Sequence, residues 1–554
     1  MKQHISTFGI MQVKTNIESF SKQFIWLNFT LLFIVLLILP NISISQNNSF
    51  VYLKNGKFML DSSEYFPLTL NYAVDIVKDI NGNFYISPHA QYCKWVKCDK
   101  GSSGFYCGTN TKEWKSTIRS HIDKIADMGF NSIRLCGLGL NYNPDKHGSG
   151  VLVSKVYHEQ HDPDNLKCFK REKRIKIKRK TINIQIDLFE AFVQIVREHN
   201  LALPDKQVKV ILTTGTGGLQ YVSWKYTKFL SVLGDRFKND PTVFAYEPNF
   251  EAYYLGYPKH EINQKYERAE DFAQWYYALK EAAPSQLVTY GASLRDVFNW
   301  DAKNFPMDFI NLHLYTSNNQ EYNSREFERY KCRLKWFSEV YDKPWIIGET
   351  GIGGNDVANR QNSLVPTEEQ QKEFASSSLA YARWYGGIGY AWWQYKEVKW
   401  FSITNPKARS NYLGLVRMKD RNEAHKVAVE SFLKFDPFVN CYTCFDPDPE
   451  IYYNPNAYEF LNLKGRIVTK EGKPVKNAFI SCKSKNENYF TFSDENGEFN
   501  LHTQPNDHIF SLIASYPGMT VIQLGKWNGP KLDPELNLTI DFLDKDLLPL
   551  QPEN

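Results

Sequence analysis

The chain has 554 residues, of which 42% are hydrophobic and 23% charged, and its formal net charge is +5. This composition indicates a globular protein with room for a large core. The net charge is small for such a length and argues against a dedicated nucleic-acid binder, so no nucleic acid is expected among its partners.

The N-terminal segment predicts export. Lys22 precedes an apolar run over residues 24–40, and the small-residue stretch NISIS follows. This pattern predicts a signal peptide over residues 1–45, cleaved after Ser45. The run is slightly long for a signal and slightly short for a spanning helix, so an uncleaved anchor is the alternative. We expect a secreted, periplasmic or cell-surface protein with no membrane span after cleavage.

The cysteines do not indicate a metal site. Cys93, Cys98 and Cys107 share a Gly/Ser-rich loop, where a disulfide would suit an exported protein. Cys441 and Cys444 have a redox spacing but lack the βαβ context, so a structural disulfide or two inert thiols are the better interpretations. Because no His/Cys cluster has zinc-site spacing, we predict no metal and no cofactor.

Residues 50–435 alternate between strand-like and helix-like segments. After a hairpin that turns at Asn55-Gly56, eight apolar runs of strand length follow, at 66–74, 131–139, 208–216, 243–251, 287–294, 308–317, 343–351 and 387–395. Amphipathic segments such as 117–130, 186–202 and 368–385 lie between them. This alternation implies a parallel sheet. Eight such units without a Gly-rich phosphate loop favour an α/β fold of the (β/α)8 (TIM) barrel type.

The C-terminal part differs in character. Residues 436–461 are rich in Pro, Asp and Asn and are predicted to be a linker, and the short alternating strands of 462–545 predict a small all-β sandwich. The stretches GRIVTKEGKPVKNA (465–478) and SDENGEFN (493–500) resemble the carboxypeptidase regulatory-like, or transthyretin-like, domain. Such modules are usually accessory, so no catalysis is expected from this part.

Chemically useful side chains follow the predicted barrel strands. They are Arg134, Glu251, His313, Tyr315, Glu349 and Trp393. In such barrels the working residues lie at the carboxyl ends of the strands. Two carboxylates with a guanidinium, an imidazole, a phenol and an indole are what retaining glycoside hydrolysis requires, with one carboxylic acid as proton donor and the other as nucleophile.

The order of these motifs resembles a known family. SIRL, DPTVFAYEPNFE, HLY, GET and AWW occur in the order seen on the strands of clan A glycoside hydrolases, particularly the cellulase/mannanase-like family five. The resemblance implies Glu251 as acid/base, Glu349 as nucleophile and Arg134 as its brace. It also implies His313, Tyr315 and Trp393 as substrate-site residues and a β-linked polysaccharide or oligosaccharide as substrate.

Strand four departs from the family pattern. Counting from Pro241 places the acid/base at Glu251 and gives Glu247 a structural role, whereas a rival register reads Tyr246-Glu247-Pro248 as the acid/base motif. The family has asparagine before the acid/base, where it bonds the sugar 2-hydroxyl; here Phe250 takes that place. Either the substrate lacks a free 2-hydroxyl, or Asn249 supplies the contact, or activity is weak or lost.

Two further alternatives stay open. The run FKREKRIKIKRK (169–180) is either a solvated exposed hairpin or a cationic lip that attracts an anionic polysaccharide. The whole chain is either a secreted retaining glycosidase or a non-catalytic carbohydrate-binding or structural protein with a degenerate barrel. Retention of two buried carboxylates favours the enzyme, because unpaired buried charges cost stability.

Overall fold

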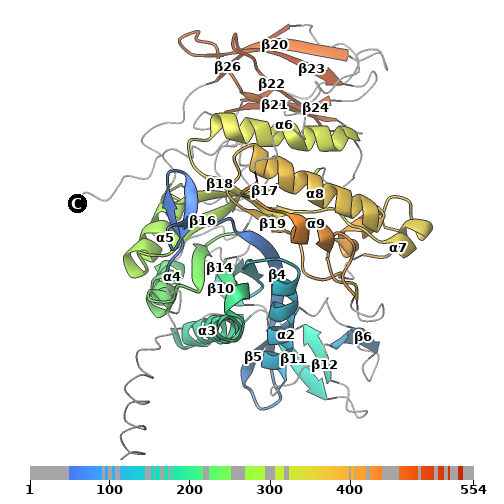
Figure 1. Ribbon diagram of the computed structural model, residues 1–554. Helices are drawn as coiled ribbons and strands as arrows, with labels where there is room; N and C mark the ends of the chain where they lie inside the picture. Colours follow the sequence, from blue (N-terminus) through green and yellow to red (C-terminus); the bar gives the residue numbers. More distant parts are fainter. Residues whose placement is uncertain are drawn as a thin grey trace, which may run out of the picture. The chain divides into compact units, whose positions relative to one another are not determined.

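A computed structural model describes the chain (Figure 1). It divides into two units, Met1–Ser49 and Phe50–Asn554, and the predicted signal peptide lies outside the described residues. The described residues are 49–89, 94–97, 103–106, 113–143, 151–154, 156–161, 167–171, 175–176, 179–215, 224–250, 269–292, 306–316, 324–398, 401–405, 407–418, 424–439, 461–484, 488–503, 509–516, 522–524 and 535–540.

Eight parallel strands close into a barrel, which confirms the predicted (β/α)8 fold. In chain order they are β4 (Leu68–Lys78), β8 (Ser132–Cys136), β14 (Lys209–Thr213), β15 (Val243–Glu247), β16 (Leu287–Ala292), β17 (Phe309–His313), β18 (Trp345–Thr350) and β19 (Tyr390–Trp392). Each pairs with its neighbour, and β19 pairs with β4 to close the ring. Closure leaves no sheet edge exposed among these strands.

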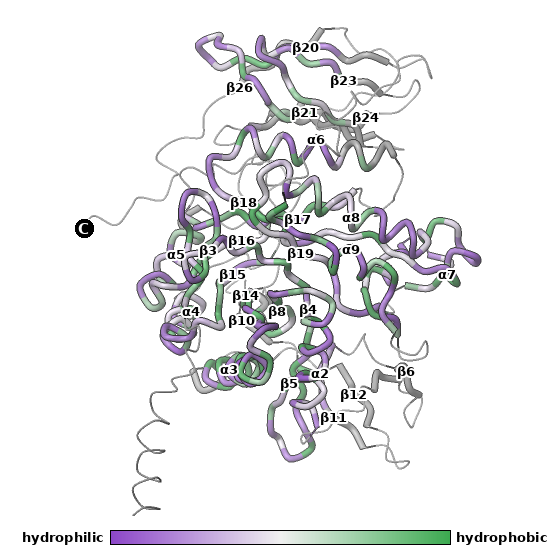
Figure 2. The backbone as a smooth tube through the Cα atoms, in the orientation of Figure 1, coloured by the Kyte–Doolittle hydropathy of each residue, from purple (hydrophilic) through white to green (hydrophobic). Residues whose placement is uncertain are grey.

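Helices surround the barrel (Figure 1). They are α2 (Trp114–Asp127), α3 (Arg179–Ala202), α4 (Trp224–Phe237), α5 (Ala269–Ala282), α6 (Ser324–Val340), α7 (Asp356–Gln361), α8 (Glu368–Trp384) and α9 (Val429–Lys434), with short 3-10 turns at Pro204–Lys206 and Ala408–Tyr412. Thr367 and Gln370 form a capping box that fixes the start of α8. Hydrophobic strand segments and polar outer turns are visible in Figure 2.

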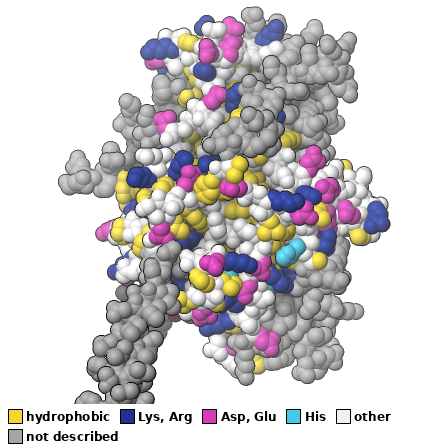
Figure 3. Space-filling view, viewed as in Figure 1, with side chains coloured by type: hydrophobic (Ala, Val, Ile, Leu, Met, Phe, Trp, Pro, Cys, Tyr) yellow, Lys and Arg dark blue, Asp and Glu magenta, His cyan; other side chains and the backbone are white. Residues whose placement is uncertain are grey.

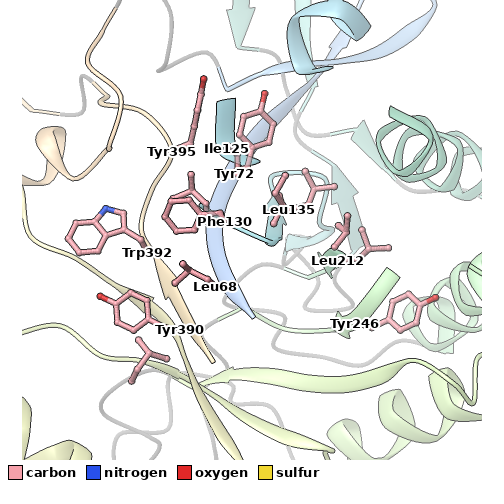
Figure 4. Close-up of a cluster of buried hydrophobic side chains, with 14 of the residues drawn as sticks. Leu68, Tyr72, Ile125, Phe130, Leu135, Leu212, Tyr246, Tyr390, Trp392 and Tyr395 are labelled. Atoms are coloured by element: carbon pink, nitrogen blue, oxygen red, sulfur yellow. The ribbon is translucent and has the colours of Figure 1, made fainter. Parts of the chain in front are cut away.

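The core between strands and helices is built from alternate strand residues. Tyr72, Leu135, Leu212 and Tyr390 come from four different strands and are fully buried in one apolar cluster (Figure 4). Because strand side chains alternate in direction, the residues between them face the barrel interior. That interior is polar toward the carboxyl ends of the strands, and the candidate site lies there.

A hairpin closes the amino end of the barrel. Strands β1 (Tyr52–Lys54) and β2 (Lys57–Leu60) pair across the predicted Asn55-Gly56 turn, and β3 (Ser63–Glu64) joins them. Phe58 is fully buried and makes edge contacts with Phe244 and Phe309, each with a centroid distance of 5.0 Å. Because the hairpin covers the amino end of the barrel, a binding site is expected at the opposite, carboxyl end.

Strand β4 continues beyond the barrel. Its second half pairs with β5 (Phe84–Pro88) and β11 (Val156–His161), which extend into β12 (Lys167–Arg171), β7 (Ser103–Tyr106) and β6 (Lys94–Lys97). A separate small sheet holds β9 (Asn141–Asn143), β10 (Val151–Ser154) and β13 (Ile175–Lys176). The basic run therefore contributes to two sheets rather than forming one hairpin.

Two small sheets form the C-terminal part. One has the order β23-β20-β26, with β20 Leu461–Thr469, β23 Glu498–Thr503 and β26 Glu535–Ile540. The other has the order β22-β21-β24-β25, with β21 Phe479–Ser484, β22 Asn488–Phe492, β24 Ile509–Ser515 and β25 Ile522–Leu524. Gly497 has φ +76°, which only glycine adopts readily in this turn.

On the face seen in Figure 3, acidic and basic side chains are interspersed across the described residues. In the described part of the chain, no helix combines the length and hydrophobicity that a membrane crossing requires.

Candidate active site

Arg134 lies at the centre of the candidate site. It sits in the middle of β8, in register with Asn71 of β4, and its side chain is fully buried inside the barrel. Its Nη1 donates to Asn71 Oδ1 at 2.7 Å and to Glu349 Oε1 at 2.6 Å, and its Nη2 donates to Glu247 Oε1 at 2.7 Å. Burial alone would lower the pKa of Arg134, but Glu247, with Cys136 and Glu349, raises it well above its usual range.

Glu247 ends β15 inside the barrel wall. Both of its oxygens accept from the Arg134 guanidinium, and Oε2 also accepts from Thr213 Oγ1 at 3.1 Å. The side chain is fully buried. A bidentate pair of this kind orients the guanidinium rigidly, so Glu247 serves as the structural partner that directs Arg134 toward Glu349.

Glu349 stands near the carboxyl end of β18, beside Arg134 and Tyr315. Oε1 accepts from Arg134, and Oε2 accepts from the Tyr315 hydroxyl at 3.1 Å. Both bonds favour the ionised carboxylate. The glycine before it, Gly348, is required by packing, because an added Cβ would lie 1.3 Å from Asn311 Oδ1. Glu349 is thus an oriented carboxylate near the carboxyl end of β18.

His313 at the end of β17 lies between the two carboxylates. Its Nε2 is 3.4 Å from Arg134 Nη2, and its Nδ1 is 3.6 Å from Glu349 Oε2. Its Nε2 also lies 4.0 Å from Glu247 Oε1, so the imidazole packs against both carboxylates.

Phe250 covers the guanidinium. Its ring centroid is 5.0 Å from Arg134 Cζ, within the range of a cation–π contact, and 5.3 Å from the His313 ring. Trp393 is half-buried, with its ring 6.3 Å from Phe250. The two aromatic rings give the site an apolar flank beside Glu349.

The two adjacent tryptophans have different surroundings. Trp392 is fully buried, donates from Nε1 to the Leu413 carbonyl at 2.9 Å, and packs against Phe374 and Phe432. Trp393 alone of the pair reaches the site. Asn249 is fully buried, and its main-chain carbonyl accepts from the Gly291 amide of β16 at 3.1 Å.

Two residues near Arg134 were not expected from the sequence. Asn71 accepts from Arg134 and donates to the carbonyls of Gly348 and Trp392, each at 3.1 Å, which joins β4 to β18 and β19. The sequence feature that could have identified Asn71 is a polar residue in the middle of an otherwise apolar strand. Cys136 Sγ lies 3.8 Å from Arg134 Nη1, and burial raises the pKa of the thiol to about 12.

Glu251, the expected acid/base, lies outside the described residues, as do the loop cysteines Cys93, Cys98 and Cys107. Among the residues that the structure describes, no group of three or more His, Cys, Asp or Glu side chains has a geometry that could hold a metal ion.

Neither a family model nor a curated protein sequence matches the chain. Three of the similar solved structures are a GH2 β-galacturonidase from Eisenbergiella tayi bound to galacturonate (14% identity, TM-score 0.39), a β-D-glucuronidase from Dictyoglomus thermophilum (15%, 0.41) and β-glucuronidase 3 from Bacteroides uniformis (10%, 0.41). The matches cover 70%, 71% and 87% of this chain. The chain spans about half the length of these structures, with 55%, 54% and 52% covered. A fold does not by itself fix an activity, so the function rests on the site.

Proposed function

We propose that this protein is an exported retaining glycoside hydrolase that cleaves β-linked polysaccharide or oligosaccharide. The observation that carries the proposal is the Glu349 carboxylate, which accepts from Arg134 and from the Tyr315 hydroxyl at the carboxyl end of a barrel strand. A carboxylate held ionised and oriented in this way is suited to attack an anomeric carbon.

The mechanism has two displacements. In the first, a Glu349 oxygen bonds to the anomeric carbon while the glycosidic C–O bond breaks, and the leaving oxygen takes a proton from Glu251. In the second, Glu251 removes a proton from water, which attacks the anomeric carbon and releases Glu349. Assignment of the acid/base to Glu251 follows from its sequence position, and is supported by Glu247 having both oxygens on Arg134.

The surroundings of Glu349 support this role. Two negative charges share one arginine, so the hydrogen bond from the Tyr315 hydroxyl lowers the cost of holding Glu349 ionised. Phe250 and Trp393 offer the apolar surface on which a sugar ring can stack. The proposal includes the resemblance of the barrel to family five glycoside hydrolases. It also includes the resemblance of the C-terminal sheets to a carboxypeptidase regulatory-like domain.

The test is reducing-sugar release from a panel of neutral and anionic polysaccharides by the protein from Gln46. Glu349→Gln keeps the size of the side chain and one acceptor oxygen but removes the nucleophile. We expect release by the wild type and a loss of at least about 10³-fold in the variant, which is in the range of the rate enhancement that covalent catalysis provides. Asp308→Asn is the matched control, since Asp308 is also a largely buried, ion-paired carboxylate but lies at the amino end of β17, away from Glu349.

The stereochemistry provides a second test. A product whose anomeric configuration is retained at the earliest time points supports double displacement, whereas inversion contradicts it. Binding of a glycan without release of reducing sugar, in wild type and variant alike, would instead indicate a barrel that only binds carbohydrate.

The panel also tests whether the substrate is anionic. If the basic run 169–180 recruits an acidic glycan, binding should weaken steeply with added salt. A salt-insensitive affinity, or activity confined to neutral glycans, would leave that run as a solvated surface.

A further inference from the structure

Tyr315 is held by its main chain as well as by its side chain. It follows β17 outside the regular strand, and its carbonyl accepts from Arg333 Nη1 at 3.1 Å. The same residue donates its hydroxyl to Glu349 Oε2 at 3.1 Å. Arg333, which lies on α6, is therefore connected to the proposed nucleophile through Tyr315.

Arg333 in turn contacts the C-terminal part of the chain. Its guanidinium lies 4.7 Å from the ring centroid of Phe490 in β22, and both side chains are buried. Phe490 packs against Phe479 at 5.6 Å and Phe492 at 6.0 Å, which fixes the ring. A cation desolvated over an aromatic face is held more strongly than one in water.

The next turn of α6 adds to the contact between this helix and the C-terminal sheets. Trp336 donates from Nε1 to the Asn477 carbonyl at 2.7 Å and stacks on Phe492 at 6.0 Å. Asn477 Nδ2 donates to Glu339 at 3.0 Å. Residues three apart lie on one face of a helix, so Arg333 and Trp336 share the face of α6 that contacts these sheets.

We propose that Arg333 is a positioning residue, which the Phe490 ring holds in place and which orients Tyr315 toward Glu349. The C-terminal sheets thereby contribute to catalysis without touching substrate. This inference rests on the proposed function, because it assigns the sheets a role in the reaction of Glu349.

The first experiment compares Arg333→Met and Phe490→Leu with wild type. Both variants keep most of the side-chain volume. Misplacement of a positioning group affects the chemical step, so kcat should fall about 10- to 100-fold while KM changes little. The acid limb of the pH–rate profile should move to higher pH, because the carboxylate loses a hydrogen bond to its charged form.

The control variant is Arg383→Met. Arg383 also lies over an aromatic ring, that of Phe66 at 5.7 Å, and donates to a main-chain carbonyl, that of Pro437, at 2.9 Å. Like Arg333, it pairs with an aromatic ring and a main-chain carbonyl, but its contacts with Phe66, Pro437 and Glu64 involve no residue of the site. The proposal requires Arg383→Met to leave kcat and the pH profile near wild type.

A double-mutant cycle tests the route through Tyr315. In a Tyr315→Phe background the hydroxyl bond is already absent, so Arg333→Met should cause no further fall in kcat. Equal losses in both backgrounds, or a loss equal to that of Arg383→Met, would overturn the proposal.

If the wild type releases no sugar from any glycan, the proposed function fails, and hydrogen exchange then decides the positioning role by itself. In intact protein, Arg333→Met and Phe490→Leu should accelerate amide exchange in the peptide covering 309–316, whereas Arg383→Met should not. Unchanged exchange in that peptide would overturn the coupling.

Discussion

Arg134 binds two buried carboxylates with a single positive charge. Its Nη1 is shared between Asn71 and Glu349, and Nε and Nη2 are directed to Glu247. No donor of the fork is left for an acidic sugar, so Arg134 serves the protein's own carboxylates. An uncompensated buried charge is far more costly than a lost surface pair.

From this we predict that Arg134→Met lowers the free energy of unfolding by about 3–5 kcal/mol, because Glu247 and Glu349 lose their counter-charge. Urea denaturation measures the change. Adding Glu247→Gln should recover part of it, since one of the two unpaired charges is then removed. Arg119→Met is the control: its pair with Asp123 is partly exposed and should contribute less than about 1 kcal/mol.

Phe250 limits the hydrogen bonds that the candidate site can offer to a ligand beside Glu349. A ring over Arg134 cannot donate a hydrogen bond, whereas an amide can. We predict that Phe250→Asn raises kcat/KM about 10-fold or more on substrates with a free 2-hydroxyl, because that contact strengthens in the transition state. Steady-state kinetics on matched 2-hydroxy and 2-deoxy glycosides checks this, with Phe250→Leu as control. Equal effects on both substrates would contradict it.

The side chains of the site were predictable in part. His313, Tyr315 and Glu349 follow apolar strands, and the carboxyl ends of parallel strands meet at one end of a barrel. Arg134 was expected as a brace for Glu349, but its place in the middle of β8 and its bonds to Glu247 and Asn71 were not readable, because they depend on side chains from other strands. Asn71 and the contact of Phe250 with Arg134 depend on the same long-range register.

At the scale of elements, a buried lysine connects the loops that follow β18 and β19. Lys426 Nζ donates to the carbonyls of Gly354 and Tyr412, each at 2.7 Å, and pairs with Glu397 Oε1 at 3.0 Å. Asn355 Nδ2 also donates to Glu397, at 2.9 Å. These bonds hold the segment after Glu349 and Trp393 in one arrangement, so the loops at this end of the barrel are fixed electrostatically.

We predict that Lys426→Met destabilises the protein by about 3–5 kcal/mol, since Glu397 is left buried without its cation. The double variant with Glu397→Gln should be milder. Lys434→Met is the control, because its pair with Glu430 is exposed and should have little effect. Urea denaturation of the three variants decides; equal effects of Lys426→Met and Lys434→Met would be inconsistent with this reasoning.

The elements themselves followed from local pattern. All eight barrel strands occur in the predicted order, and the Asn55-Gly56 turn forms the expected hairpin. The continuation of β4 into a second sheet was missed, because a strand's partners beyond the barrel are set by distant segments such as β11 and β12. Periodicity identifies a strand but not its neighbours.

At the scale of the whole molecule, helix α6 joins the barrel to the C-terminal sheets within the unit Phe50–Asn554. Trp336 is almost completely buried by its contacts with Asn477 and Phe492 as well as with its own helix. Two parts that share buried aromatic area unfold together, because separation exposes that area to water. We therefore predict one cooperative thermal transition for the wild type and two for Trp336→Ala, in which the C-terminal sheets unfold at lower temperature than the barrel.

Differential scanning calorimetry measures this, and Trp114→Ala is the matched control. Trp114 is a similarly buried tryptophan on α2, where it stacks on Tyr85 at 6.4 Å inside the barrel unit. Its loss should cost about 3–5 kcal/mol through cavity formation but leave a single transition. If Trp336→Ala lowers the transition temperature without splitting the transition, α6 is only one of several connections, and the effect of Phe490→Leu on kcat should then be correspondingly small.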